Sequence, residues 1–366
     1  MSNHKPFIVR EFFLCALLLA GVLTWSVGAQ TQSPAAPPLT NEEFVRLVRQ
    51  LPARPSMRDE IVTEVRRRGI GFPLTSGLRS LLATKSGNDA LLRRTLEEAE
   101  RRRVNPVAAA LPSEAEGANV LAEARAATDA AVQAMPDFVV KQQVVRAYAR
   151  GTTQNWKVDD RLTVAVSFRV KEGEQYRVLA VNGLPVASDS PTSGSYTNLG
   201  GTSSTGEYVS RLAMLFAPES QAKFKMVDTD TLRGRRAIVY EYEIKRENSR
   251  ATITYNNERS VIVGNRGRVW IDRETFRILR LEIISTDIAP DFPVTASSNA
   301  IDYDWVTIAE RQYLLPVRAV LEMTAAQRGE TFQTRNDIRF RGYQKFGTEV
   351  RVLEEDIIDE ELEKKP

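Results

Sequence analysis

The segment from Thr331 to Tyr343, TFQTRNDIRFRGY, alternates apolar and polar residues strictly enough to limit how this chain can fold. Phe332, Ile338 and Phe340 share one parity, and the charged side chains of the segment all take the other. Successive residues of a strand point to opposite faces of its sheet. The segment therefore predicts a strand with one face on an apolar interior and the other face toward water, as in antiparallel sheets.

The same two-residue period recurs over much of the chain, for example in LTVAVSFRV, AIVYEYEI and LLPVRAVLEM. Short turn sequences such as VNGLP, LRGRR, GNRGR and DRET separate these segments. Strands joined by so few residues must pair antiparallel, because a parallel crossover needs about a dozen residues. We expect about eleven strands between Phe138 and Leu353, with one long interruption from Gly183 to Pro218.

A sheet of that many strands must curl rather than stay flat. We therefore predict an α+β fold in which a strongly curved antiparallel sheet, a half-open β-barrel, carries a covering helix. A small all-α bundle precedes it, because Thr40 and Glu43 form a capping-box pattern ahead of apolar residues at helical spacing. The bundle is predicted to hold Glu97/Arg101 and Glu98/Arg102 pairs on its last helix.

Pro/Ala-rich stretches and changes in periodicity divide the chain. The predicted parts are a targeting segment (1–29), a linker (30–39), the helical bundle (40–103), a second linker (104–117), a helix with the curved sheet (118–353) and an acidic tail (354–366).

The first part has the features of an export signal. Lys5 and Arg10 precede an apolar run over residues 12–27, and small residues follow at 27–29. We expect cleavage and an exported, periplasmic protein. The alternative is an uncleaved segment that anchors the protein to the inner membrane through residues 12–27.

The only Cys and the only His of the chain, Cys15 and His4, both lie in this segment. The predicted mature chain thus has no Cys/His zinc site, no thiol nucleophile, no Ser/His/Asp triad and no disulfide. We predict no cofactor and no metal site. Lys5, Arg10 and Glu11 leave with the segment, so the net charge falls from +3 to +2, which does not favour a nucleic-acid partner.

Charge is nevertheless unevenly distributed. Residues 40–103 have fourteen basic and nine acidic side chains, whereas residues 354–366 have seven acids and two lysines. The simpler interpretation is two solvated surfaces. The alternative hypothesis is that the acidic tail docks on the basic bundle.

The interruption begins with GTSSTGEY, Gly201 to Tyr208, whose glycine spacing resembles a phosphate-binding P-loop. Glu207 stands where the P-loop lysine belongs and Tyr208 where its Ser/Thr belongs, so we exclude a nucleotide. Ser204 and Glu207 instead predict a capping box at the start of the covering helix. Gly201 and Gly206 are candidates for a hinge.

The helix predicted after this loop has an apolar stripe of Tyr208, Leu212, Leu215 and Phe216. These four residues are the candidate ligand-binding residues. The alternative is that the stripe completes the hydrophobic core.

The layout of residues 118–353 resembles the lipoprotein carriers of the LolA/LolB superfamily, in which a helix precedes an antiparallel meander interrupted by a covering helix. The sequence is also similar to an uncharacterised family of exported bacterial proteins, at the strings GEYVSRLAMLFAP, TLRGRRAIVYEY, VWIDRETFRILRLE, IDYDWVTIAERQYLLPVRA and NDIRFRGYQKFG. LTNEEFVRLVRQL with IVTEVRRRGIGFPLTSGLRSLL is similar to a short helical module appended to varied bacterial proteins.

The carrier resemblance implies a cavity between sheet and covering helix, with a lipid or a lipid-modified protein as partner. It transfers no individual residue, because such carriers hold acyl chains by an apolar cavity. We therefore predict a binding protein without enzymatic activity.

Two other functions remain open. The first is a structural or scaffolding protein of the cell envelope whose barrel is fully packed. The second is a carboxylate-dependent hydrolase using Asp302 and Asp304, which lie about 6.6 Å apart on one face of a strand, a spacing found in inverting glycosidases. Both aspartates lie opposite Tyr303 and Trp305, which predicts that they face solvent, so no catalytic residue is assigned.

Overall fold

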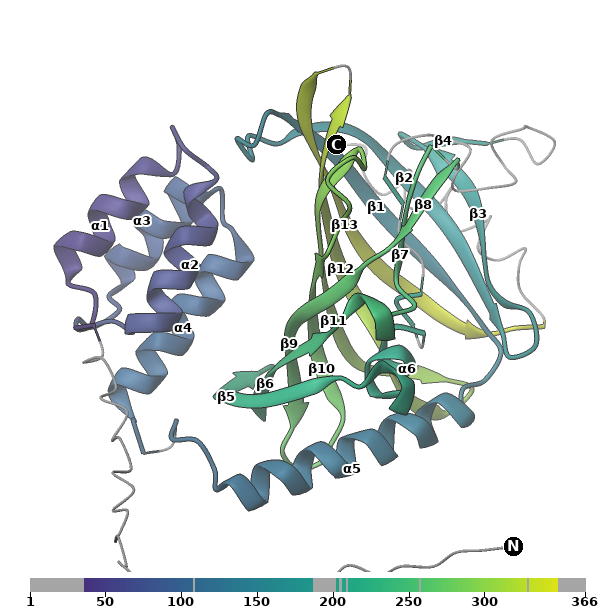
Figure 1. The fold of residues 1–366 in the computed structure, drawn as a ribbon, viewed down its shortest axis with the longest axis horizontal. Coiled ribbons are helices and arrows are strands. Elements are labelled where there is room, and N and C mark those ends of the chain that lie inside the picture. The colour runs from purple at the N-terminus through teal and green to yellow at the C-terminus, as the bar shows by residue number, and fades with distance from the viewer. Residues whose placement is uncertain are drawn as a thin grey trace, which may run out of the picture. The chain divides into compact units, whose positions relative to one another are not determined.

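The structure, a computed structural model, describes residues 36–107, 109–186, 202–203, 206–208, 210–256, 258–327 and 329–347. A helical module precedes an antiparallel sheet with two further helices (Figure 1). The predicted targeting segment 1–29 and the acidic tail 354–366 lie outside the described residues. None of the described helices is long and apolar enough to cross a membrane.

The helical module consists of α1 (Asn41–Gln50), α2 (Met57–Arg68), α3 (Ser76–Ser86) and α4 (Ala90–Val104). The predicted capping box of α1 is confirmed, because Glu43 N donates to Thr40 Oγ1 at 3.2 Å and Thr40 N donates to Glu43 Oε2 at 3.0 Å. Buried apolar residues of all four helices form one cluster, so the module has its own core. Of the two predicted pairs on α4, Glu98/Arg102 is confirmed at 2.6 Å, whereas Glu97/Arg101 is wrong because Glu97 binds Arg79 at 2.7 Å.

The main sheet has eleven strands, all paired antiparallel, in the order β4-β3-β2-β1-β13-β12-β11-β10-β9-β6-β5. Its strands are β1 (Phe138–Arg150), β2 (Lys157–Arg169), β3 (Gly173–Val181), β4 (Leu184–Pro185), β5 (Lys223–Leu232), β6 (Arg235–Ile244), β9 (Gly264–Asp272), β10 (Ile278–Thr286), β11 (Val294–Ile308), β12 (Arg311–Gln327) and β13 (Glu330–Lys345). The predicted α+β fold with a preceding helical bundle is confirmed.

One face of this sheet carries the largest apolar core. Alternate residues of its strands contribute to it, as predicted: Leu162, Val164 and Val166 on β2, for example, are buried while their neighbours are more exposed. The helices α5 (Glu114–Gln133) and α6 (Ser210–Phe216) supply further residues of the same core, and α5 contacts both β9 and α6 (Figure 1). We call this side the inner face of the sheet.

α5 lies close to the sheet at Gly117. A Cβ at that position would lie 2.8 Å from Met226 Sδ, and the carbonyl of Gly117 accepts a hydrogen bond from Tyr240 Oη at 2.7 Å. A larger residue would have to displace the flexible end of the Met226 side chain on β5.

A second, two-stranded sheet pairs β7 (Thr252–Tyr255) with β8 (Arg259–Ile262). Its Ile253 packs in a separate small cluster with Phe292, with Val294 of β11 and with Ala325 of β12.

One sequence-based expectation about the interruption needs correction. The helix of the interruption was expected to begin at Ser204, but α6 begins at Ser210, and Glu207 lies in a turn ahead of it with no exposed surface. Ser204 itself lies outside the described residues.

The segment from Phe138 to Arg150 is a central strand, and at its two register shifts the extra residue belongs to β13 and to β2. It has apolar residues on both faces because both faces are covered: Phe138 and Val140 pack in the inner core, whereas Val139 packs in a small cluster on the other side.

The sequence predicts that the arginine-rich side of the helical module is solvated, but this side contacts the sheet. Arg58, Arg94 and Arg102 make ion pairs with carboxylates on the outer face of the sheet, to Glu322 at 2.9 Å, Asp230 at 3.1 Å and Asp228 at 2.5 Å. Arg66 and Arg101 add pairs to Glu282 and Asp230. The partner of this side of the module is therefore the sheet.

Candidate functional site

The residues predicted to contact a ligand lie on the inner face of the sheet, where most of them are part of the core. Tyr208, Leu215 and Phe216 are 1%, 3% and 7% exposed, and Leu212 is half-buried beside them. We call residues 206–208 and 210–220 the plug. The structure brings all four predicted residues together on it, but Tyr208 lies in the turn before α6 and not on the helix.

Tyr208 is surrounded by aromatic rings. Its ring centroid lies 5.4 Å from that of Phe138 on β1 and 5.4 Å from that of Phe340 on β13, in an edge-on arrangement with the latter. Tyr343 lies farther away at 6.4 Å. Such contacts add to the burial free energy of an aromatic side chain, so Tyr208 anchors the plug to β1 and β13.

The second anchor of the plug is at its other end. Phe216 stacks on Phe224 of β5 with centroids 5.7 Å apart and an angle of 9° between the rings. The half-buried Leu212 lies between the two aromatic anchors in the sequence.

Beneath the turn before α6, the inner face is polar instead of apolar. Gln142 Nε2 donates to Tyr208 Oη at 3.1 Å, and Tyr303 Oη donates to the carbonyl of Glu207 at 3.2 Å. Tyr176 Oη and the backbone N of Gly206 both donate to Glu174 Oε2, at 2.5 and 2.8 Å. We call Gln142, Glu174, Tyr176, Glu207 and Tyr303 the polar cluster.

Burial changes the acid–base properties of this cluster. Burial and the nearby charge of Glu207 raise the pKa of Glu174, against the opposing hydrogen bonds from Tyr176 and Gly206. Burial also raises the pKa of Tyr176, Tyr208 and Tyr303 well above the usual range of tyrosine. The tyrosines are therefore neutral hydrogen-bonding groups at physiological pH.

Two acceptor atoms of the cluster are buried without a hydrogen-bond partner among the described residues: Oε1 of Gln142 and Oε1 of Glu174. A buried acceptor without a donor costs about 1–3 kcal/mol. The site therefore favours a molecule that brings a donor, whether water or the polar group of a ligand.

The predicted hinge residues can be placed only in part. Gly206 has φ of +86°, a conformation that favours glycine, and its N–H is one of the two donors to Glu174. Gly201 lies outside the described residues.

Sequence reasoning did not identify Gln142, Glu174 and Tyr176. A signal was present in part, because Gln142 has the parity of the inward-facing Val140 and Val144, and polar residues at inward positions are unusual. The buried Val139 and Lys141 of the opposite parity obscured that signal.

The two aspartates considered for hydrolysis both have structural partners. Asp302 accepts from Arg280 at 2.7 Å and Asp304 binds Arg233 at 3.0 Å, both on the face opposite the buried Tyr303. Within the described residues, no three His, Cys, Asp or Glu side chains are grouped to hold a metal ion.

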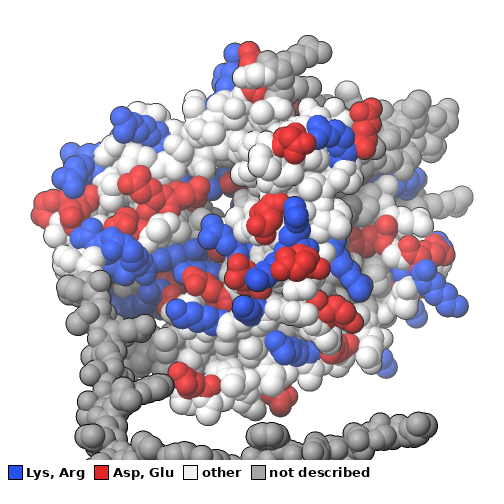
Figure 2. All heavy atoms as spheres, in the orientation of Figure 1, with Lys and Arg blue, Asp and Glu red and all other residues white. Residues whose placement is uncertain are grey.

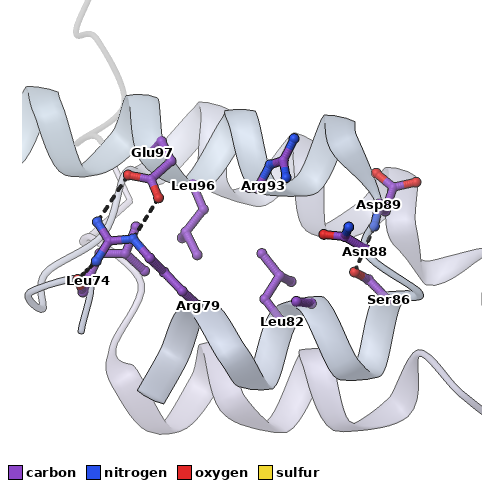
Figure 3. Close-up of a pocket in the computed structure, with 10 residues that line it drawn as sticks. Leu74, Arg79, Leu82, Ser86, Asn88, Asp89, Arg93, Leu96 and Glu97 are labelled. Atoms are coloured by element: carbon purple, nitrogen blue, oxygen red, sulfur yellow. Dashed lines mark hydrogen bonds and ion pairs between the residues drawn. The ribbon is translucent and has the colours of Figure 1, made fainter. Parts of the chain in front are cut away.

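The helical module contains a small hollow between α3 and α4, shown in Figure 3. Leu82 and Leu96 line it, and the ion pair between Arg79 and Glu97 lies at one end. Its volume is ≈ 50 Å³, whereas small-molecule sites usually have about 300–1,000 Å³. The hollow is too small for an organic ligand of ordinary size.

No protein-family model matches the sequence, and a search of curated proteins finds no match. Among solved structures, a DUF1329 family protein from Desulfovibrio piger matches with a TM-score of 0.27 and 10% identity, over 65% of this chain and 96% of the other. The MucA/MucB complex of Pseudomonas aeruginosa matches at 0.18 and 9%, over 63% and 94%. MucB in complex with MucA(peri) matches at 0.16 and 11%, over the same shares. These are weak structural similarities.

Proposed function

We propose that the protein is an exported, non-enzymatic binding protein whose ligand is amphipathic, such as a lipid or a lipid-modified protein. The ligand takes the place of the plug on the inner face of the sheet. Its apolar part replaces Leu212, Leu215 and Phe216, and its polar part donates to the polar cluster.

The observation that carries this proposal is a pair of buried acceptors on the inner face, Gln142 Oε1 and Glu174 Oε1, which have no hydrogen-bond partner among the described residues. A core that serves stability alone is better filled by apolar side chains, because a partly satisfied polar network costs free energy. Gln142 is only 1% exposed, so solvent does not compensate its free acceptor. A hydroxyl, amide or ammonium group of a ligand would donate a hydrogen bond to this acceptor.

The plug is suited to exchange because its own helix is short. α6 has seven residues, too few to be stable without tertiary contacts. Its position depends on the aromatic anchors at Tyr208 and Phe216. A ligand that offers equivalent apolar area compensates for the loss of these contacts.

The alternative is the structural or scaffolding protein, which the burial of the plug favours. Tyr208, Leu215 and Phe216 already fill part of the inner face. In that case the plug never leaves the core and the protein takes up no apolar ligand.

A fluorescence titration with N-phenyl-1-naphthylamine, a probe that becomes bright in apolar sites, separates the two functions. We expect saturable binding by the wild-type protein and tighter binding by Leu215→Ala, because truncation weakens the plug and leaves room beneath it.

Leu82→Ala is the matched control, since Leu82 is also 3% exposed but lies in the core of the helical module. It should destabilise the protein without changing probe affinity. Absence of saturable binding by both the wild type and Leu215→Ala would support the structural function instead.

A further inference from the structure

The outer face of the sheet, opposite the plug, is divided by charge. Its carboxylates on β5, β10 and β12 bind the arginines of the helical module: Asp228, Asp230, Glu282 and Glu322. These strands all lie on one side of β13 in the sheet order. The helical module thus neutralises the acidic half of this face.

The other half of the outer face is basic. Lys141 of β1 lies opposite Arg341 of β13 on one side and opposite Ala165 of β2 on the other. Ala165 in turn lies opposite Arg177 of β3. Arg339 and Arg161 occupy neighbouring positions of the same face, opposite Gln143 and Val145 of β1. We call these five basic residues the basic stripe: Lys141, Arg161, Arg177, Arg339 and Arg341.

Three members of the basic stripe are exposed, namely Arg161, Arg339 and Arg341. Within the part of the chain that the structure describes, no carboxylate forms an ion pair with these three side chains. Asp337, the nearby acid on β13, is held by Arg318, which donates to it from Nη2 at 2.5 Å and from Nε at 3.1 Å. The exposed arginines therefore present uncompensated positive charge. Figure 2 shows one face of the molecule, on which acidic and basic side chains are interspersed.

The end of β13 directs the chain toward this stripe. Phe346 packs with Val139 and Leu179 on the outer face, and its backbone N donates to the carbonyl of Asp137 at 3.1 Å. The guanidinium of Arg169 lies 4.0 Å from the centre of the Phe346 ring. Ala165, which pairs with both Lys141 and Arg177, packs in the same cluster, so Phe346 lies next to the stripe.

We propose that the acidic segment 354–366 docks on the basic stripe of the same chain. The segment has seven carboxylates and two lysines, which complement the stripe. Seven residues separate Phe346 from Glu354, and an extended chain spans about 3.3 Å per residue. The stripe extends over three strand spacings of about 4.8 Å each, so the segment reaches all of it.

The helical module is the other basic surface, but it is a poorer partner for the segment. Five of its arginines already bind carboxylates of the sheet, as described above. Its remaining exposed arginines, among them Arg49 and Arg93, are on different helices, α1 and α4. The uncompensated charge adjacent to the end of β13 belongs to the sheet.

Electron paramagnetic resonance of a nitroxide attached to Ile358→Cys tests this docking in the full chain, with Cys15→Ser removing the only native thiol. We expect restricted label motion at low salt and free motion at about 1 M salt, where the Debye length is about 3 Å. The double variant Arg339→Gln/Arg341→Gln should free the label at low salt. The matched double variant Arg49→Gln/Arg93→Gln, which removes the same charge from the helical module, should leave it restricted.

Several results would overturn the proposal. Free label motion in the wild-type background at low salt means that the segment does not dock. Release by the Arg49/Arg93 variant alone means that it docks on the helical module, and release on dilution means that it docks on a second copy. If phosphatidylglycerol vesicles bind through Arg339 and Arg341 while the label stays mobile, the stripe serves a membrane surface instead.

Discussion

Arg280 of β10 donates from Nη1 to Asp302 Oδ1 of β11 at 2.7 Å, across adjacent strands on the outer face of the sheet. Its Nη2 also binds Glu282 at 3.0 Å, and its guanidinium lies 5.7 Å from the centre of the Trp270 ring. Both members of the pair are largely buried, with side chains 10% and 23% exposed. Asp302 is thus an ion-pair partner of Arg280 within the sheet.

Replacement of Asp302 should therefore affect stability. We expect Asp302→Asn to lower the free energy of unfolding by about 1.5–3 kcal/mol, the usual range for a hydrogen bond to a charged group. Asp304→Asn is the control, since Asp304 is 42% exposed in its pair with Arg233 and such pairs contribute about 1 kcal/mol or less. Urea unfolding measures both. A hydrolytic activity that Asp302→Asn abolishes without loss of stability would contradict this role.

Asp230 is the main carboxylate that holds the helical module on the sheet. Its side chain has no exposed surface and accepts from Arg94 at 3.1 Å, from Arg101 at 2.5 Å and from Trp270 Nε1 at 2.9 Å. Asp230→Asn removes the carboxylate that binds Arg101 and leaves Arg94 with Glu282 alone, at 3.2 Å. Breaking a buried pair in this way costs about 3–5 kcal/mol. We expect faster proteolysis in the linker after α4 and a lower unfolding free energy.

The control for Asp230→Asn is Asp291→Asn, because Asp291 is 83% exposed and lies 3.6 Å from Arg259. It should leave both measurements nearly unchanged. Equal proteolysis of the two variants would show that the ion pairs of Asp230 do not hold the module.

Glu98 gives the contact between module and sheet a dependence on pH. Burial and the negative charges of Asp230 and Asp228 raise its pKa to about 7, against the attraction of Arg102. Because this native-state pKa exceeds the ordinary value of 4.5, the native protein binds the proton more tightly than the unfolded chain does. The stability that protonated Glu98 contributes is therefore present at low pH and lost between about pH 4.5 and pH 7.

Glu98→Gln removes this titration. We take the free energy of unfolding of the variant minus that of the wild type at each pH. We expect this difference to be more favourable to the variant at pH 8 than at pH 5, by on the order of 2 kcal/mol. The control Glu100→Gln lacks such a difference, because the hydrogen bond from Arg103 lowers the pKa of Glu100 and keeps it ionised throughout this range. Melting temperatures at the two pH values test the prediction, and identical shifts for both variants would refute it.

The strands and helices of this protein could be predicted because they depend on local patterns. The alternation in Leu162 to Val166 and the capping box at Thr40 and Glu43 are visible in the sequence and recur in the structure. The count of about eleven strands followed from turn spacing, and the main sheet has eleven.

The contacts between distant segments could not be predicted in the same way. An arginine of α4 such as Arg94 has the pattern of a solvated helix face, and only the fold brings it to Asp230, 136 residues later in the chain. Glu207 fitted a capping box in the sequence, but the turn before α6 places it in the interior. The polar cluster joins β1, β3, β11 and the plug, so no single segment contained its pattern.

Native mass spectrometry tests the central proposal most directly. The protein is purified without detergent from cells that express it, so that cellular lipids can remain bound. Binding of an amphipathic ligand in place of the plug predicts extra mass that organic solvent releases as lipid or acyl-modified material. Glu174→Gln should reduce the bound fraction, because it replaces a buried carboxyl acceptor at the floor of the site. A wild-type protein that carries only its own mass, and gains none when incubated with phospholipid vesicles, would contradict the proposal.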